Sequence, residues 1–510
     1  MQAKCERIPR RTGIARLSWT RGIQVPYCVL HYTSHPLPCS NHNHTHEPGF
    51  IVANLSPPDH ITLRSFAFAR CHELFSVVVA AMSSSPQVYQ ATCSAPVNIA
   101  VIKYWGKRDT SLILPTNDSL SVTLDQDHLR SVTSARADAS FGQQDRLWLN
   151  GEEEVIKADG RLRRCIDEMK KLRQAKEHND SSLPKLSEWA VHVCSENNFP
   201  TAAGLASSAS GFAALIASLA ALYELQPEVS SSELSRIARQ GSGSACRSLF
   251  GGYVAWQGGD AADGQDSLAV EVAPQSHWPD LQALICVVSD AKKGTPSTAG
   301  MQRTVQTSPL LQHRIKQVVP ARMADISAAI QQRDFDTFAA ITMADSNNFH
   351  ACCLDTTPPI FYMNDVSRAI VQLVEEINRA SEADGNGKLV AYTYDAGPNA
   401  VLYAPKANMP LVLQTIRHYF PNADFDDTFD LLGKGINASH RGDQEALGLA
   451  KDLASSFNPN VIPVHEAGAV RRLIHTQVGD GPRVLERGLA SESLLNDAGE
   501  PIRLQRAKRA

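Results

Sequence analysis

The chain has 510 residues, of which 43% are hydrophobic and 20% are charged, and its formal net charge at pH 7 is −4. This length and composition are typical of a globular protein with two or three domains and a large core. The charge gives no reason to expect nucleic acid or an anionic membrane as a partner, no stretch reaches the roughly 18 apolar residues that a bilayer-spanning helix needs, and eleven cysteines without a Cys-x-x-Cys pair indicate reduced thiols in the cytosol.

Residues 1–85 differ in composition from the rest of the chain. They are rich in Arg, His, Ser and Pro, contain few acidic residues and show no sustained hydrophobic period. We predict a low-order extension, which could be a disordered leader, translated sequence ahead of a functional start at Met82, or a mitochondrial transit peptide. The transit peptide is the alternative to a cytoplasmic location. The three alternating histidines at 42–46 are expected to bind metal adventitiously at most.

Hydrophobic patterning from Tyr89 onward predicts a globular region that contains both strands and helices. Strands are predicted at 93–103, 120–124, 147–151, 189–194, 281–289, 389–394 and 400–403, and helices at 161–176, 212–223, 234–239, 320–332, 335–347 and 367–380. A break rich in Gly, Asp and Ala at 258–275 predicts a linker between domains at 86–278 and 279–485. A loose polar tail is predicted at 486–510.

A loop of small residues precedes the predicted helix at 212–223. It runs from Pro200 to Gly211 and contains Gly204 and the adjacent hydroxyls of Ser207 and Ser208. Such a loop leaves unpaired N–H groups at the start of a helix, where the helix dipole favours a phosphate. The alternative is a serine-rich cap on a core helix, since the loop lacks the Gly-Lys-Ser/Thr ending of a Walker A motif.

Three further segments carry residues suited to chemistry. Residues 95–109 end in a basic and aromatic run from Lys103 to Arg108, which could surround an anion or form a solvated turn. Residues 241–252 combine small residues with Arg247, whose guanidinium could grip a carboxylate or phosphate, or lie on the surface. Asp395 lies in a turn between two apolar strands, where it could act as a general base or bond its own backbone.

Together these segments resemble the diphosphomevalonate decarboxylase family, of the fungal and animal type, within the GHMP kinase superfamily. The resemblance rests on residues 94–100, 103–109, 114–117, 195–211, 236–252, 361–365 and 394–401, and it spans about 400 residues, from 82 to 482. It implies two α+β domains with the active-site cleft between them, and a homodimer. The implied reaction is the ATP- and Mg²⁺-dependent decarboxylation of (R)-5-diphosphomevalonate to isopentenyl diphosphate, in the mevalonate pathway of isoprenoid and sterol biosynthesis.

The same resemblance implies a role for each matching residue. Asp395 accepts the proton of the substrate's 3-hydroxyl, and Arg247, Lys103 and Asn98 surround the substrate carboxylate. Substrate-binding positions are implied at Tyr104, Trp105, Gly106, Lys107, Arg161, Ser242, Gly243, Ser244, Ala245, Cys246, Arg247, Ser297 and Thr298. Gly204, Ser207 and Ser208 are implied to bind ATP, and Ser208 also Mg²⁺. The loop at 292–298 departs from the family pattern at Gly294 and Pro296, so its geometry is not predicted.

Two alternatives remain at this point. A GHMP-family kinase of mevalonate or phosphomevalonate would transfer phosphate without decarboxylation. The Arg247 segment and the run from Lys103 to Lys107 favour the decarboxylase over the kinase. A catalytically inactive, regulatory relative is the alternative from a different class, and the presence of Asp395, Arg247 and Ser208 argues against it.

Overall fold

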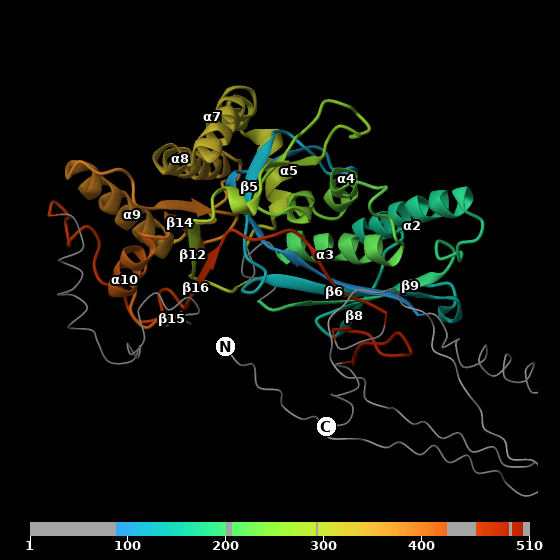
Figure 1. Cartoon of the computed structure of the whole chain (residues 1–510). Helices are drawn as coiled ribbons and strands as arrows, with labels where there is room; N and C mark the ends of the chain where they lie inside the picture. The colour runs from blue at the N-terminus through green and yellow to red at the C-terminus, as the bar shows by residue number, and fades with distance from the viewer. Residues whose placement is uncertain (1–87, 200–206, 292–293, 426–454, 489–491, 503–510) are drawn as a thin grey trace, which may run out of the picture. The chain divides into compact units, whose positions relative to one another are not determined.

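The computed structural model describes residues 88–199, 207–291, 294–425, 455–488 and 492–502, all of which belong to one compact unit. The predictions made for residues 1–85, for Gly204 and for most of the loop around it lie outside the described residues. Among the described residues, runs of strands and runs of helices follow one another along the chain and most neighbouring strands are antiparallel, which confirms the predicted α+β class (Figure 1). The domain boundary at 278/279 stays a prediction.

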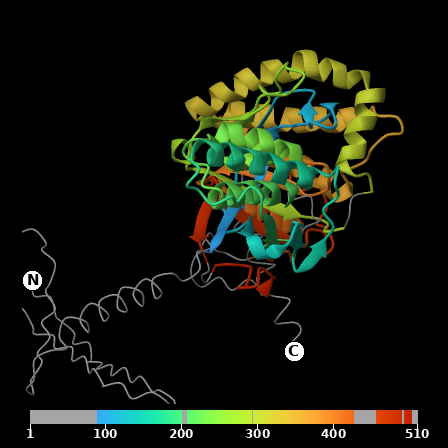
Figure 2. The same ribbon diagram turned by 90° about the vertical axis from the view of Figure 1, so that its right-hand side faces the viewer.

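The first sheet has six strands in the order β17-β1-β6-β9-β7-β8. All neighbours are antiparallel except β7 and β9, which run parallel. The apolar helix α3 packs across β1 and β6, with α2 and α4 beside it, and these helices form the green layer above the strands in Figure 2. The elements are β1 Tyr89–Pro96, β6 Arg130–Asp138, β7 Arg146–Leu149, β8 Glu152–Glu154, β9 Ala190–Asn197, β17 Arg483–Arg487, α2 Arg161–Asn179, α3 Ser207–Leu222 and α4 Ser231–Gly241.

The second sheet has four antiparallel strands in the order β11-β10-β5-β2. The 3-10 helix η2 connects α4 to β10 and packs against β2 and β5. A short hairpin, β3 with β4, follows β2 and carries the basic run of the sequence. The elements are β2 Asn98–Ile102, β3 Lys107–Asp109, β4 Leu114–Pro115, β5 Ser119–Thr123, η2 Gly243–Leu249, β10 Tyr253–Trp256 and β11 Ala269–Ala273.

The third sheet has five strands in the order β13-β14-β12-β16-β15, and its apolar side chains share one core with those of β2 and β5. Helix α8 packs against β13, β14 and β2, so it connects the third sheet to the second. The strands are β12 Leu281–Val287, β13 Ala391–Tyr394, β14 Ala400–Pro405, β15 Asp424–Phe425 and β16 Arg472–Gln477. The helices are α5 Ser297–Thr307, α6 Pro309–His313, the π-helix η4 Arg314–Val318, α7 Val319–Gln332, α8 Phe335–Leu354, α9 Asp365–Ala383 and α10 Met409–Tyr419.

Two predictions about connecting segments are wrong. The tail predicted at 486–510 is not loose where it is described, because β17 pairs with β1 and Leu495 is buried against Trp148 and Cys194. The linker predicted at 258–275 ends in β11, which pairs with β10. The single strand predicted at 93–103 is also wrong, because the chain breaks at Val97 into β1 and β2, which belong to different sheets. The remaining predicted strands and helices are confirmed, although their ends differ, by up to seven residues at the end of α8.

Candidate functional site

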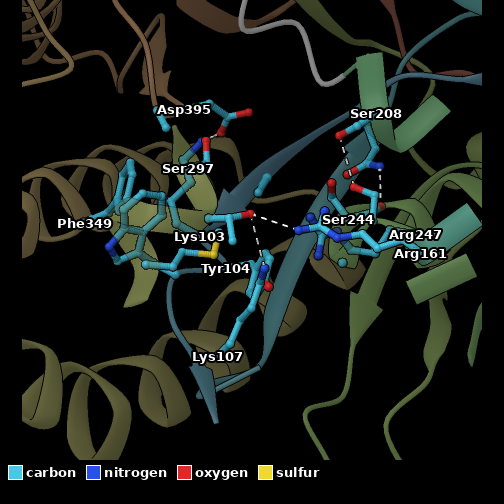
Figure 3. A pocket seen from close by; sticks show the side chains of 18 residues that line it. Lys103, Tyr104, Lys107, Arg161, Ser208, Ser244, Arg247, Ser297, Phe349 and Asp395 are labelled. Atoms are coloured by element: carbon cyan, nitrogen blue, oxygen red, sulfur yellow. Dashed lines mark hydrogen bonds and ion pairs between the residues drawn. The ribbon is translucent and has the colours of Figure 1, made fainter. Parts of the chain in front are cut away.

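A cavity of about 200 Å³ collects most of the residues that the sequence singled out. Its walls come from β2 and the segment after it, from α2, α3, η2, α5 and α8, and from the turn after β13 (Figure 3). The cavity therefore draws on residues from both sides of the predicted domain boundary. The lining residues are Asn98, Ala100, Lys103, Tyr104, Trp105, Lys107, Arg161, Ser208, Ser242, Gly243, Ser244, Arg247, Ser297, Thr298, Met301, Phe349, Asp395 and Ala396.

Lys103 and Asp395 form an ion pair in the cavity wall. Lys103 Nζ donates to Asp395 Oδ1 over 2.7 Å (Figure 3). Lys103 directly follows β2 and Asp395 directly follows β13, so the ends of two strands from different sheets bring the charges together. The lysine side chain is 3% exposed and the aspartate 32%. Burial lowers the pKa of Lys103, and the charge of Asp395 opposes that shift, while the carboxylate itself remains partly open to a ligand.

Arg247 lies in η2 with its guanidinium buried and held by hydroxyls. Its Nε donates to Ser121 Oγ over 2.9 Å and its Nη1 to Ser119 Oγ over 2.7 Å. Both serines belong to β5, where alternate residues point to the same face of the sheet. No carboxylate among the described residues forms an ion pair with Arg247, and burial lowers its pKa. A buried cation that is oriented by neutral groups is suited to receive an anionic ligand.

Asn98 extends the same wall from β2. Its Nδ2 donates to the Ser244 carbonyl over 3.0 Å and to Ser248 Oγ over 2.8 Å. Its Oδ1 is buried and has no hydrogen-bond partner among the described residues. The amide therefore ties β2 to η2 and leaves an acceptor for a donor that a ligand could supply.

Lys107 and Arg161 meet at one hydroxyl at another end of the cavity. Thr298 Oγ1 accepts from Lys107 Nζ over 3.4 Å and from Arg161 Nη2 over 3.2 Å (Figure 3). Burial and the nearby Arg161 lower the pKa of Lys107 to about 8. Arg161 also stands in the first turn of α2, where the helix dipole disfavours a cation. Two cations around a neutral hydroxyl are the arrangement that a phosphate or diphosphate would stabilise.

Ser208 presents its hydroxyl at the N-terminus of α3 and interacts with Ser242 Oγ at 3.1 Å. Its side chain is exposed and lines the cavity, which fits contact with a nucleotide phosphate. Ser207 is half-buried and does not line the cavity, and Gly204 lies outside the described residues. Among the described residues, no group of three His, Cys, Asp or Glu side chains could hold a metal ion by itself.

Aromatic packing fixes the segment between Lys103 and Lys107. Tyr104 packs edge-on against Trp256, and its buried hydroxyl has no hydrogen-bond partner among the described residues. Trp105 Nε1 donates to Thr304 Oγ1 over 3.0 Å. Gly106 has φ +102°, a conformation that L side chains rarely adopt, and this turn directs Lys107 into the cavity.

The structure does not bring every predicted residue to the cavity. Gly106 turns the chain beside it, and Ala245 and Cys246 are fully buried within η2 and do not line it. Ser297 and Thr298 line it from the first turn of α5, whereas Lys292 and Lys293 lie outside the described residues.

Four lining residues were missed by the sequence reasoning. They are Ala100, Met301, Phe349 and Ala396. Ala100 lies two residues after Asn98 on the same strand face, and Met301 lies one helical turn after Ser297, so both carried a usable signal. Ala396 simply follows Asp395. Phe349 had no signal, because an aromatic residue within a buried helix is ordinarily part of the core.

No helix in the described ranges combines the length and apolar character needed to cross a membrane.

Comparisons with known proteins identify the family. Residues 95–269 match the model of the diphosphomevalonate decarboxylase-like N-terminal domain, and residues 283–485 match that of the mevalonate 5-diphosphate decarboxylase C-terminal domain. The diphosphomevalonate decarboxylase of Ganoderma lucidum is 66% identical over 416 residues, which cover 81% of this chain and 99% of the relative.

Solved structures agree with this similarity. A crystal structure of mevalonate 5-diphosphate decarboxylase is 49% identical, covers 81% of this chain and 99% of its own, and superposes with a TM-score of 0.67. A protein designated MDDEF, solved in complex with MVAPP, AMPPCP and magnesium, is 28% identical, covers 78% of this chain and 100% of its own, and gives a TM-score of 0.57. The chain therefore belongs to the diphosphomevalonate decarboxylase family.

Proposed function

We propose that this chain catalyses the ATP-dependent decarboxylation of (R)-5-diphosphomevalonate to isopentenyl diphosphate, with release of ADP, phosphate and carbon dioxide. Relatives with up to 66% identity over nearly their whole length carry this activity in their names. The observation in the cavity that carries the proposal is the Lys103–Asp395 pair beside a buried Arg247 that forms no ion pair with a carboxylate among the described residues. A kinase that only transfers phosphate has no evident need for a second buried cation at that place.

In the proposed reaction the substrate's tertiary 3-hydroxyl becomes a leaving group. Asp395 accepts the hydroxyl proton while that oxygen attacks the γ-phosphorus of ATP, and ADP leaves. Phosphate then departs with the electron pair of the C3–O bond, and the pair from the bond to the carboxylate forms the new double bond as carbon dioxide leaves. Lys103 orients the Asp395 carboxylate through their 2.7 Å contact. Catalysis of this kind depends on positioning and on charge stabilisation.

Two further parts of the cavity take the two phosphate groups in this proposal. Lys107, Arg161 and Thr298 bind the diphosphate of the substrate, and Ser208 at the start of α3 contacts the phosphates of ATP. A hydroxyl such as that of Ser208 fits as one ligand of a Mg²⁺ ion that nucleotide phosphates also hold, since Mg²⁺ in nucleotide sites is bound largely through phosphates and water. When bound, the ion would neutralise phosphate charge. The complex of MDDEF with MVAPP, AMPPCP and magnesium supports the binding of a nucleotide and Mg²⁺ by this family.

The test is an assay of purified protein with ATP and (R)-5-diphosphomevalonate, in which released carbon dioxide is trapped and ADP is measured. Equal yields of carbon dioxide and ADP are expected. Phosphoryl transfer to mevalonate or phosphomevalonate without carbon dioxide would instead support the kinase alternative. No turnover with any of the three substrates would support an inactive relative.

We also propose that the protein acts as a homodimer in the cytoplasm and supplies precursors for sterol synthesis. Family resemblance supports the dimer, and the cysteine usage of the sequence supports a reducing compartment. Sedimentation at equilibrium tests the first proposal, and fractionation of cells that express the full chain tests the second.

A further inference from the structure

The backbone of Lys103 is held on both sides by one buried ion pair. Asp345 Oδ1 accepts from the Lys103 N–H over 2.8 Å, and Arg314 Nη2 donates to the Lys103 carbonyl over 3.0 Å. Arg314 and Asp345 bond each other through two contacts of 2.8 Å, and both side chains are 0% exposed. The two partners of the pair therefore enclose the peptide groups of the residue that contacts Asp395.

The position of Lys103 explains why its backbone needs these partners. Lys103 directly follows the last residue of β2, where ladder hydrogen bonds end, and buried N–H and C=O groups must still be satisfied. Asn117 Nδ2 also donates to the Lys103 carbonyl over 3.1 Å, and Arg314 completes the set of partners on that side. A buried ion pair is a costly solution, because well-packed apolar residues often serve stability equally well. An arginine adds a rigid, planar guanidinium group, the fork, whose N–H donors give each hydrogen bond a fixed direction. Arg314 also lies in the π-helix η4, a conformation that occurs frequently at functional sites.

The helix that carries Asp345 also holds the strand that leads to Asp395. Ser346 Oγ accepts from the Tyr394 N–H over 3.0 Å, and the His350 ring lies edge-on to the Tyr394 ring with centroids 6.2 Å apart. Burial and the charge of Lys103 lower the pKa of His350 to about 4, so its ring is neutral at physiological pH. Helix α8 packs against both β2 and β13. One helix thus fixes the backbone at both ends of the Lys103–Asp395 contact.

We propose that Arg314 and Asp345 are positioning residues for the decarboxylation, and that they set the place where the Lys103 ammonium meets the Asp395 carboxylate. The inference rests on the proposed function. Neither residue lines the cavity, so they act through Lys103 and make no contact with the substrate. We call the two side chains that enclose the Lys103 peptide groups, Arg314 and Asp345, the clasp. Loss of the clasp should lower turnover more than it weakens substrate binding, because displacing a catalytic group by about 1 Å can cost ~10²-fold in rate.

Arg314→Lys tests the proposal, and Arg173→Lys is the matched control. Arg173 is also buried, bonds Glu177 through Nε over 2.8 Å, and donates to the carbonyls of Tyr223 and Pro184 over 3.0 Å each. Both substitutions keep the charge and remove the fork, so both should lower stability. At a temperature where circular dichroism shows both variants folded, we expect Arg314→Lys to lower kcat ~10²-fold with little change in KM for ATP. Arg173→Lys should keep the kcat of the original protein.

Equal kcat values for the two variants would overturn the proposal. If Arg314→Lys does not fold, Asp345→Asn replaces it, with Glu177→Gln in the buried Arg173 pair as its control. Asp345→Asn should lower kcat by about tenfold because a neutral amide holds Arg314 and the Lys103 N–H less strongly, and a kcat equal to that of Glu177→Gln overturns the proposal. Assay of the unsubstituted protein distinguishes failure of the proposed function from failure of the positioning role. If that protein releases no carbon dioxide, the proposed function fails, whereas normal release with unaffected variants refutes only the positioning role.

Discussion

Replacement of Asp395 by asparagine keeps the shape of the side chain and removes its charge. The amide cannot accept the proton of the 3-hydroxyl, and it holds Lys103 only through a neutral hydrogen bond in place of the 2.7 Å ion pair. A positioned general base contributes ~10²–10⁴-fold to a rate. We expect kcat to fall ~10³-fold, while KM for the diphosphate substrate, which Lys107 and Arg161 are proposed to hold, changes much less.

The same substitution should have a limited effect on stability. An uncompensated buried charge is strongly destabilising, but burial lowers the pKa of Lys103 and loss of the Asp395 charge lowers it further, which favours the neutral amine. Asp395 is 32% exposed, and solvent therefore screens part of the interaction that is lost. We expect the free energy of unfolding to decrease by about 1–3 kcal/mol, toward the lower end of that range, in urea titrations.

The assay measures trapped carbon dioxide under saturating ATP and diphosphomevalonate, with Asp365→Asn as the matched control. Asp365 is 90% exposed at the start of α9 and outside the cavity, so its substitution should leave turnover unchanged. An Asp395→Asn variant that retains turnover within tenfold of the original would refute the role of general base. A loss of activity that disappears once the folded fraction is matched would show an effect on stability alone.

Three further substitutions test other residues of the cavity wall and the turn beside it. Arg247→Lys should lower kcat/KM for the diphosphate substrate ~10–10²-fold, because lysine cannot reproduce the fork held by Ser119 and Ser121; near-normal kinetics would contradict this. In the unsubstituted protein, kcat/KM for the diphosphate substrate should fall as pH rises through about 8, where Lys107 loses its proton. Arg161→Gln removes one cause of the lowered Lys107 pKa and should move this fall in kcat/KM to higher pH. A fall at an unchanged pH would refute its assignment to Lys107. Gly106→Ala should reduce the free energy of unfolding by about 1–3 kcal/mol, because φ is +102° and the added Cβ would lie 2.5 Å from Thr116 Oγ1. Gly211→Ala, in an open place on α3, is its control in urea titrations and should not destabilise.

Sequence patterning predicted the strands and helices that contribute residues to the cavity, but it did not predict which of these residues lie close together. The strands that end near Lys103 and Asp395, and the helix that begins at Arg161, follow from apolar periodicity and flanking turn residues. Those two charged residues are 292 positions apart, and no periodicity links them. Their neighbourhood was predicted only through resemblance to a family.

Strand β6 shows why some buried structure was missed. Its sequence mixes Arg, Ser and Thr with small apolar residues, which favours an exposed segment, yet it lies between β1 and β9. Buried hydroxyls pair across the strands, Thr92 with Ser134 at 2.7 Å and Thr133 with Ser195 at 2.9 Å. A polar side chain that forms a hydrogen bond with a neighbouring strand looks the same in the sequence as one that faces water. The two can be distinguished only when the neighbouring strand is known.

The clasp around Lys103 had no signal in the sequence. Arg314 and Asp345 are 31 positions apart on different helices, and each alone is indistinguishable from a surface charge. The same applies near the end of the chain, where Arg483 pairs with the distant Asp127. Ion pairs of this kind depend on tertiary contacts, and a local pattern does not contain them.

The two ends of the cavity would respond differently to the course of the reaction. Decarboxylation removes the carboxylate proposed to contact Arg247 but leaves the diphosphate proposed to lie between Lys107 and Arg161 unchanged. The product would therefore retain one anchor of the substrate and lose the other. Inhibition by accumulated isopentenyl diphosphate follows from this asymmetry, and the ratio of product to substrate dissociation constants would measure how much of the binding free energy the Arg247 end supplies.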